Sequence, residues 1–214
     1  MKQFIKFVLY AVVFAAFSTA NADNSVAFFR AINIDNVSAV KDLLAKGQDP
    51  NALDEKGQVG LFLAMREDSP KVLQALLAHP AIQVDAANAA GETALMMAAI
   101  KGNLAGCKLL LDKGAAVNRS GWTPLHYAAS STADTGAQVV ALLLEKAAQI
   151  EAPSPNRTTP LMMAARYGTD SSALLLLGKG ASTKARNDAG LDAPAFARLA
   201  AREALAVKLE QGAK

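Results

Sequence analysis

Hydrophobic and polar residues alternate along the chain in short segments of two kinds. The first kind is a small-residue segment with an Ala-Ala pair, at 98–99, 128–129 and 164–165. The second kind is a leucine run, at 43–44, 76–77, 109–111, 142–144 and 174–177, often followed by glycine and a polar turn. Glycine suits the left-handed position that ends a helix. We therefore predict pairs of short helices, one alanine-rich and one leucine-rich, separated by polar turns.

The helix pairs return at a fixed spacing. A short turn segment after each leucine run ends at Asn51, Asp85, Asn118, Glu151 or Lys184, so successive segments lie 34, 33, 33 and 33 residues apart. A constant period of this length is the signature of a repeat protein. One unit cannot bury its apolar face alone, and stacking of neighbouring units builds a continuous core.

The fullest copy of the repeat resembles the signature of the ankyrin family. It reads GWTPLHYAA at 121–129, with near copies at 93–96 and 159–162 and degraded copies at 59–62 and 192–195. Thr123 can cap the first helix, and Pro124 suits the first helical position because no N–H is needed there. The resemblance implies an all-α ankyrin-repeat solenoid of about six helix-turn-helix units joined by short hairpin loops.

The repeat domain is expected to occupy residues 23–214. Its units fall at about 23–52, 53–86, 87–118, 119–152, 153–185 and 186–214. The two end units should shield their outer faces from water with polar residues. Those residues are Asp35, Asn36, Lys41 and Asp42 in the first unit, and Arg198, Arg202, Glu203 and Lys208 in the last.

The fourth repeat has an unusual distribution of length. Its hairpin, from Asn118 to Gly121, is about three residues shorter than the others, and its helix–helix link at 130–136 is about three residues longer. The two changes cancel, so the period is kept. Neutral drift in surface loops and a contact with a partner both explain such a change.

Residues 1–22 are expected to be a signal peptide. Two lysines precede an unbroken apolar run at 7–17, and Ala20-Asn21-Ala22 offers a small-residue cleavage site after Ala22. A membrane anchor is disfavoured, because eleven apolar residues fall short of the ~20 that cross a bilayer. We expect an exported protein with no membrane association after cleavage. The periplasm is our first choice and secretion the second, because the chain has one cysteine and so no internal disulfide.

The composition disfavours an enzyme and a nucleic-acid binder. The chain has one cysteine and two histidines, His79 and His126, which are too few and too far apart for a metal site. We found no nucleophile elbow and no phosphate-binding loop, and we expect no cofactor. The net charge is +3, from 22 basic and 19 acidic residues without a basic stripe.

Three residues with reactive side chains receive structural interpretations, and two methionines are left open. Cys107 lies in a leucine-rich helix and is expected to be a buried small hydrophobe. The ankyrin resemblance implies that His126 forms hydrogen bonds within the repeat framework, whereas His79 should be a solvated turn residue. Met97 and Met163, each second in a Met-Met pair, are open between core packing and a soft contact surface.

The resemblance implies that a protein partner binds at the hairpin tips and on the concave face of the first helices. Transferred position by position, this surface contains Glu55, Lys56, Gln58, Arg66 and Glu67; Ala89, Ala90, Glu92, Ile100 and Lys101; Arg119, Ser120, Trp122, Ser130 and Ser131; and Thr158, Arg166 and Tyr167. Trp122, Arg166 and Tyr167 are the expected anchors, because Trp, Tyr and Arg dominate interface hot spots. Packing of Trp122 on the next hairpin is the alternative. Arg157 replaces the usual glycine of its hairpin, so we expect distortion there.

The predicted function is that of a monomeric, non-enzymatic binding module. The chain resembles small exported bacterial ankyrin proteins, some associated with catalase function and peroxide resistance. This resemblance implies support of a periplasmic partner such as an oxidative-stress enzyme. The alternatives are an immunity or inhibitor protein against a toxic periplasmic hydrolase and a secreted effector that binds host proteins.

Overall fold

The computed structural model describes residues 24–212. The predicted signal peptide therefore lies outside the described residues. The chain divides into two compact parts, the first ending at Gly91 and the second beginning at Glu92, and each is described by itself. None of the helices within residues 24–212 has the length and apolar character needed to cross a membrane.

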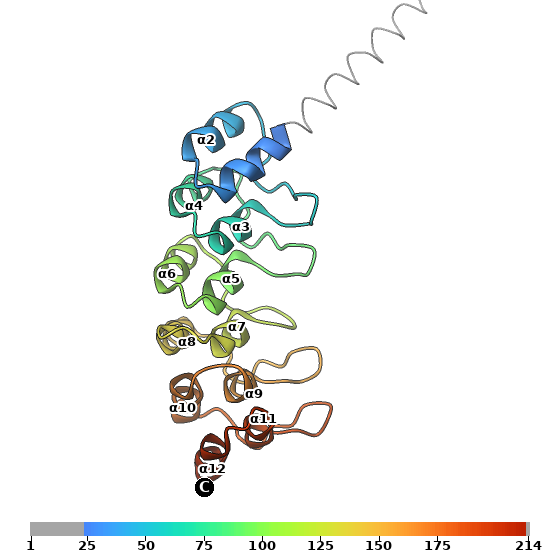
Figure 1. Cartoon of the computed structure of the whole chain (residues 1–214), viewed down its shortest axis with the longest axis vertical. Coiled ribbons are helices and arrows are strands. Elements are labelled where there is room, and N and C mark those ends of the chain that lie inside the picture. The colour runs from blue at the N-terminus through green and yellow to red at the C-terminus, as the bar shows by residue number, and fades with distance from the viewer. Residues whose placement is uncertain (1–23, 213–214) are drawn as a thin grey trace, which may run out of the picture. The chain divides into compact units, whose positions relative to one another are not determined.

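The first part contains two helix pairs. Helical residues 24–33 precede α2 (Val37–Ala45), and α3 (Gly60–Arg66) precedes α4 (Pro70–Leu77) (Figure 1). The hydroxyl of Ser69 donates to the Ile32 carbonyl at 2.7 Å, and Asp35 accepts from the Val72 N–H at 2.9 Å. These two polar bonds join the successive pairs around a core that buries Ile32 and Val72.

The second part contains four helix pairs. They are α5 (Ala94–Ile100) with α6 (Leu104–Asp112), α7 (Pro124–Ser130) with α8 (Gly136–Glu145), α9 (Pro160–Arg166) with α10 (Asp170–Gly178), and α11 (Ala193–Leu199) with α12 (Glu203–Gln211). Within this part the first helices form one row and the second helices another, and the hairpin loops leave from the row of first helices (Figure 1). The predicted Ala pairs of α5, α7 and α9 are fully buried, which lets neighbouring first helices approach closely.

Each first helix of α5, α7 and α9 begins at a threonine whose neighbour three positions on completes the cap. Thr93 Oγ1 accepts from the Met96 N–H, and the Met96 sulfur accepts from the Thr93 N–H, both at 3.4 Å; Thr159 and Met162 repeat this arrangement. In α7 the equivalent residue is His126, whose Nδ1 lies 3.2 Å from the Thr123 nitrogen. The hydroxyl cap predicted for this motif is thus present at Thr93 and Thr159, whereas at Thr123 the backbone N–H bonds the His126 ring and the hydroxyl lies 2.8 Å from the same nitrogen.

His126 has the structural role expected of it. Because Nδ1 accepts from the Thr123 N–H, Nε2 carries the proton and donates to the Thr158 carbonyl at 3.0 Å. The ring is fully buried, and burial lowers its pKa below the ordinary histidine value. His126 therefore links repeats four and five as a neutral ring.

The period of the sequence corresponds to an asparagine that ties successive loops together. Asn51 donates to the Ala81 carbonyl and accepts from the Gln83 N–H, both at 2.8 Å. Asn118 makes the same pair of bonds, with the Ala147 carbonyl and the Gln149 N–H. The short polar segments that mark the period thus satisfy backbone groups of the following repeat.

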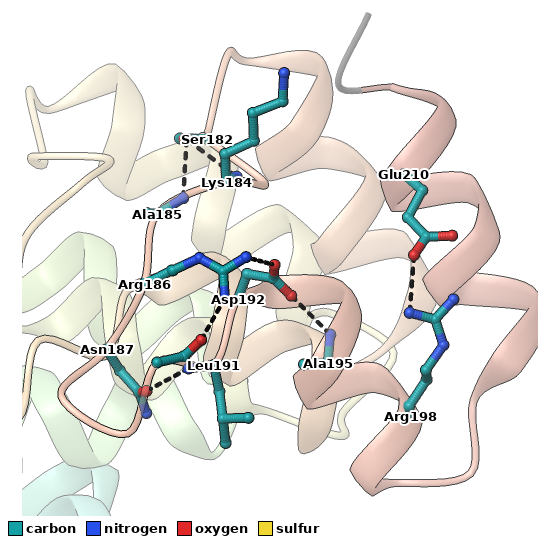
Figure 2. Close-up of polar contacts among 11 residues, drawn as sticks. Ser182, Lys184, Ala185, Arg186, Asn187, Leu191, Asp192, Ala195, Arg198 and Glu210 are labelled. Atoms are coloured by element: carbon teal, nitrogen blue, oxygen red, sulfur yellow. Dashed lines mark hydrogen bonds and ion pairs between the residues drawn. The ribbon is translucent and has the colours of Figure 1, made fainter.

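The last repeat ends the second part with charged side chains. Figure 2 shows Asp192 capping α11 through the Ala195 N–H at 3.1 Å, and Arg198 bonded to Glu210 at 2.8 Å. Arg202 donates to three carbonyls at the end of α9, those of Ala164, Ala165 and Gly168, at 2.9–3.0 Å. Part of the charge predicted for the outer surface therefore turns inward and satisfies the end of a neighbouring helix.

The regular hairpins share one hydrogen-bond frame. In the first part the Asp54 N–H donates to the Gln58 carbonyl, and in the second part Ser154 donates to Thr158 and Asn187 to Leu191, all at 2.9–3.0 Å. The expected distortion at Arg157 is wrong. Arg157 adopts a left-handed φ of 58°, in the same region as Gly57 at 70° and Gly190 at 74°, and its side chain pairs with Asp188.

The fourth repeat has the shortened hairpin and the lengthened link that the sequence predicts, although the link is two residues longer and not about three. Residues 131–135 separate α7 from α8, whereas three residues separate the other first and second helices within the described chain. Within the second part, no backbone hydrogen bond closes residues 118–122 into the frame of the regular hairpins. The longer link is packed rather than free, because Thr135 donates to the Gly102 carbonyl at 2.6 Å and Ser131 is fully buried.

Candidate protein-binding site

A small apolar hollow lies beside α7, next to the shortened hairpin. Its volume is about 290 Å³, and its walls are Ile100, Trp122, His126, Tyr127, Ser130 and Met163. These residues come from α5, α7, α9 and the loop that precedes α7, all in the second part. We call it the α7 hollow.

Trp122 forms one wall of the α7 hollow and remains accessible. Its ring packs edge-to-face against His126, with centroids 5.2 Å apart and planes at 78°. With 36% of the residue exposed, part of the Trp122 side chain is open to solvent. His126 is buried and hydrogen-bonded at both ring nitrogens, so its contact holds the Trp122 ring in place. The exposed part of that ring is accessible to a partner.

Tyr127 forms a second wall, and its hydroxyl is fixed. The hydroxyl donates to Glu92 at 2.9 Å. Burial and the neighbouring carboxylate raise the pKa of Tyr127 above its ordinary range, with Arg119 opposing them, so the phenol stays neutral and keeps donating. Its ring therefore presents a positioned apolar face to the α7 hollow.

Sequence reasoning missed Tyr127 as a site residue and left Met163 undecided. Tyr127 occupies the repeat position held by Met97 in α5 and Met163 in α9, and all three are half-buried, whereas Met96 and Met162 are fully buried. The shared position, one residue before the Ala pair, was the available signal. It identifies a row of side chains at the surface rather than in the core.

Basic side chains lie close to the apolar walls. The Arg166 guanidinium stands over the Tyr167 ring, 5.1 Å from its centroid, and 48% of Tyr167 is exposed. Arg119 is exposed on the shortened hairpin, close enough for its charge to act on Tyr127. Arg166 lies three residues after Met163 on α9, which places both on one side of that helix.

The structure distributes the predicted surface residues unequally. Three of them, Ile100, Trp122 and Ser130, line the α7 hollow. Six more lie in the loops before α5 and α7 or at the ends of α5 and α9, namely Glu92, Lys101, Arg119, Ser120, Arg166 and Tyr167. The first part contains Glu55, Lys56, Gln58, Arg66, Glu67, Ala89 and Ala90, where Arg66 pairs with Glu67 at 2.6 Å and Gln58 accepts from Asn88 at 3.1 Å.

Two predicted contact residues need correction. Ser131 is fully buried and its hydroxyl accepts from the Ala133 N–H, so it organises the α7–α8 link. Thr158 is 2% exposed, and its backbone bonds both Ser154 and His126. Ser131 is buried as part of the lengthened link, and the hydrogen-bond frame of its own hairpin holds Thr158.

The remaining chemistry of the described residues is structural. No group of three acidic, histidine or cysteine side chains within residues 24–212 is arranged to hold a metal ion. Cys107 is buried as expected, and burial raises the pKa of its thiol to about 12, which makes it a poor nucleophile at neutral pH. His79 accepts from the Ala81 N–H at 3.2 Å in its turn.

The family profile described as "Ankyrin repeats (3 copies)" matches residues 28–120, 80–154 and 116–187. The chain belongs to the ankyrin-repeat family. The predicted all-α ankyrin-repeat fold is thereby confirmed. Ankyrin repeats bind protein partners and are generally non-enzymatic, so this chain is a protein–protein interaction module.

Curated relatives share the repeats but are much longer proteins. The nuclear factor NF-kappa-B p105 subunit of Gallus gallus is 34% identical over 154 residues, which are 69% of this chain and 16% of that protein. The B-cell lymphoma 3 protein homolog of Mus musculus is 31% identical over 155 residues, 69% of this chain and 34% of that protein. The chain thus spans about a sixth to a third of these relatives.

A solved structure is similar over nearly the whole of its matching chain. It is the predatory endopeptidase Bd0816 from Bdellovibrio bacteriovorus in complex with the immunity protein Bd3460. The similar chain is 28% identical with a TM-score of 0.70, and the match covers 86% of this chain and 97% of that chain.

Proposed function

We propose that this protein is an exported inhibitor that binds a peptidase of the producing cell and keeps it inactive. The observation that carries the proposal is the similarity to a chain of an endopeptidase–immunity protein complex. That match spans 97% of the solved chain, whereas the p105 match spans 16% of its relative. Similarity over a whole chain is the stronger guide to a shared role.

The geometry of the second part supports binding through the face that contains the α7 hollow. Trp122 and Tyr167 are exposed aromatic side chains on short capped helices or the loops that border them. Rigid aromatic side chains lose little conformational entropy on binding and are typical hot spots. A preformed surface of this kind suits the lasting masking of an enzyme, because little ordering cost opposes association.

Export of the protein is part of the proposal. The basic start, the short apolar run and the Ala-Asn-Ala site of residues 1–22 support delivery to the periplasm. An inhibitor must share the compartment of its target. The predicted support of an oxidative-stress enzyme such as a catalase rests on resemblance alone, and no described residue favours it.

The test is capture from the periplasm followed by an activity assay. Full-length protein with its own leader and a C-terminal tag is purified beside a Trp122→Ala, Arg166→Ala, Tyr167→Ala triple variant. We expect one stoichiometric partner with peptidase activity that is blocked in the complex, and loss of that partner from the variant. A partner whose activity the protein raises, or a partner without hydrolytic activity, would contradict the proposal.

A further inference from the structure

We infer that the α7 hollow binds one aromatic or large aliphatic side chain of the partner protein, with a carboxylate of the same segment lying beside it. The inference rests on the proposed function in one respect, namely that the partner is a protein. It adds the chemistry by which this face recognises that partner.

The size of the α7 hollow fits a single side chain. Small-molecule and cofactor sites usually measure ~300–1,000 Å³. At about 290 Å³ the hollow lies at the lower edge of that range and opens on the surface beside Trp122. One ring or branched chain seated there would be held on several sides, as is typical of an interface hot spot.

Apart from the indole N–H of Trp122, the polar groups in the walls of the hollow are already hydrogen-bonded within the protein. Tyr127 donates to Glu92, and the Ser130 hydroxyl donates to the His126 carbonyl at 2.8 Å. Both ring nitrogens of His126 are bonded as well. A sugar or a nucleotide would lose hydrogen bonds to water without regaining them, whereas an apolar side chain loses none.

The same walls favour a protein segment over a free apolar molecule. The indole N–H of Trp122 donates no hydrogen bond to the residues that the structure describes. It can therefore donate to a main-chain carbonyl of the segment that carries the bound side chain. A hydrocarbon ligand offers no acceptor for this group.

The positive charge near the hollow favours an acidic residue next to the bound side chain of the partner. Arg119 lies on the shortened hairpin, where its charge acts on Tyr127, and Arg166 lies one turn after Met163 on α9. Arg119 forms no salt bridge within residues 24–212. The carboxylate of Glu92 accepts a hydrogen bond from the Tyr127 hydroxyl. Guanidinium groups next to two of the walls, Tyr127 and Met163, attract a carboxylate and repel a basic segment.

The test uses a displayed library of random heptapeptides on the immobilised full-length protein. We expect enrichment of sequences in which Phe, Trp, Leu or Met lies within two positions of Asp or Glu. The protein has one tryptophan, so intrinsic fluorescence reports the hollow directly, and a synthetic enriched peptide should shift Trp122 emission. Enrichment of basic or purely polar peptides would overturn the inference.

Filling the hollow provides the matched comparison. Met163→Trp should weaken binding of the enriched peptide by about tenfold or more, because an occupied anchor pocket loses a hot-spot contact. Met97→Trp places the same ring at the equivalent position of α5 and should leave binding within about twofold, with far-UV circular dichroism confirming that both fold. Ser130→Phe fills the hollow from α7 and covers the case in which Met163→Trp unfolds. Unchanged binding in both filled variants would overturn the inference.

Charge reversal tests the inference that a carboxylate of the partner lies beside the bound side chain. An Arg119→Glu, Arg166→Glu double variant should still select the apolar residue but lose the preference for Asp or Glu beside it. Retention of that preference would contradict the assigned role of the two arginines. If the wild-type chain self-associates and Met163→Trp abolishes that association, a second copy of this chain occupies the α7 hollow, which would overturn the inference.

The inference and the proposed function fail separately. If the captured peptidase is blocked equally well by wild type and by Met163→Trp, the inhibitor assignment stands and the α7 hollow is not the anchor site. If the enriched peptide binds the hollow but no peptidase is captured or inhibited, the recognition chemistry stands and the assigned function does not.

Discussion

The hairpins of repeats four and five occupy equivalent places and differ in what they expose. In repeat five, Ser154 and Thr158 close the loop, and Thr158 is 2% exposed immediately before the capping Thr159. In repeat four the loop is shorter and lacks that closure within the described hydrogen bonds, and Trp122, at the same place before Thr123, is 36% exposed. The equivalent position is therefore buried in the regular hairpin and exposed in the shortened one.

The comparison also explains how a repeat loses residues without losing its packing. The additional residues between α7 and α8 return the chain to register, so Leu143 of α8 is as completely buried as Leu110 of α6 and Leu176 of α10. The link that supplies those residues packs over Gly102, where a side chain would collide with Ala133. The length change thus affects the hairpin and leaves the helices in place.

Truncating a core leucine should reduce the stability of the protein by the same amount in repeat four as in repeat five. Leu143→Ala and Leu176→Ala each remove a fully buried side chain, and each should lower the free energy of unfolding by about 2–5 kcal/mol. Urea unfolding followed by circular dichroism measures both. If Leu143→Ala cost far less than Leu176→Ala, the frame of repeat four would be looser than its register indicates.

Removing Trp122 should separate recognition from packing. Trp122→Ala should weaken partner binding by about 2 kcal/mol or more, roughly 30-fold, as expected of a central hot spot. Its cost in stability should stay near 1 kcal/mol, because the lost contact is one edge-to-face pair. Calorimetric titration measures the loss of binding free energy, and thermal unfolding measures the loss of stability. The control is Leu199→Ala, an exposed apolar residue on α11 outside the α7 hollow, which should bind normally.

Replacing glycine by alanine should destabilise the protein in the shortened hairpin, where φ is positive, but not at the end of α10. Gly121 has φ of +79°, so Gly121→Ala should cost about 1 kcal/mol even though its new carbon would meet only Pro155 at an ordinary distance. Gly178→Ala, in open space within α10, should instead be neutral or stabilising by up to about 1 kcal/mol. Thermal unfolding compares them, and equal shifts would show that residues 118–122 relax freely.

The histidine of repeat four should make stability depend on pH. Burial lowers the pKa of folded His126, so the unfolded chain binds its proton first as the pH falls below about 6.5. Stability should therefore decrease on acidification, by at most about 1.4 kcal/mol per pH unit, until the folded pKa is reached. His126→Met adopts the residue found at the same position in α5 and α9. Unfolding between pH 7.5 and 5 should show that the variant loses this dependence; an unchanged slope would assign it to other groups.

The features that repeat were predictable from the sequence, and the features specific to one loop were not. Thr123, His126 and the alanine pairs follow from a pattern that neighbouring units copy, so their roles could be inferred by comparison within the chain. Arg157 was misjudged because a non-glycine residue can adopt a left-handed φ when a hairpin frame and an ion pair hold it. Ser131 was misplaced because burial in a lengthened link depends on what lies beneath it. Tyr127 was missed because motif positions were treated as framework.

The most direct test of the central claim is an inhibition titration of the captured peptidase. Increasing amounts of wild-type protein, or of Met163→Trp, are added to a fixed amount of enzyme while substrate cleavage is followed. The account predicts that activity falls to its floor at one equivalent of wild type and that the filled variant needs at least about tenfold more. Activity that stays constant or rises as wild type is added would contradict it.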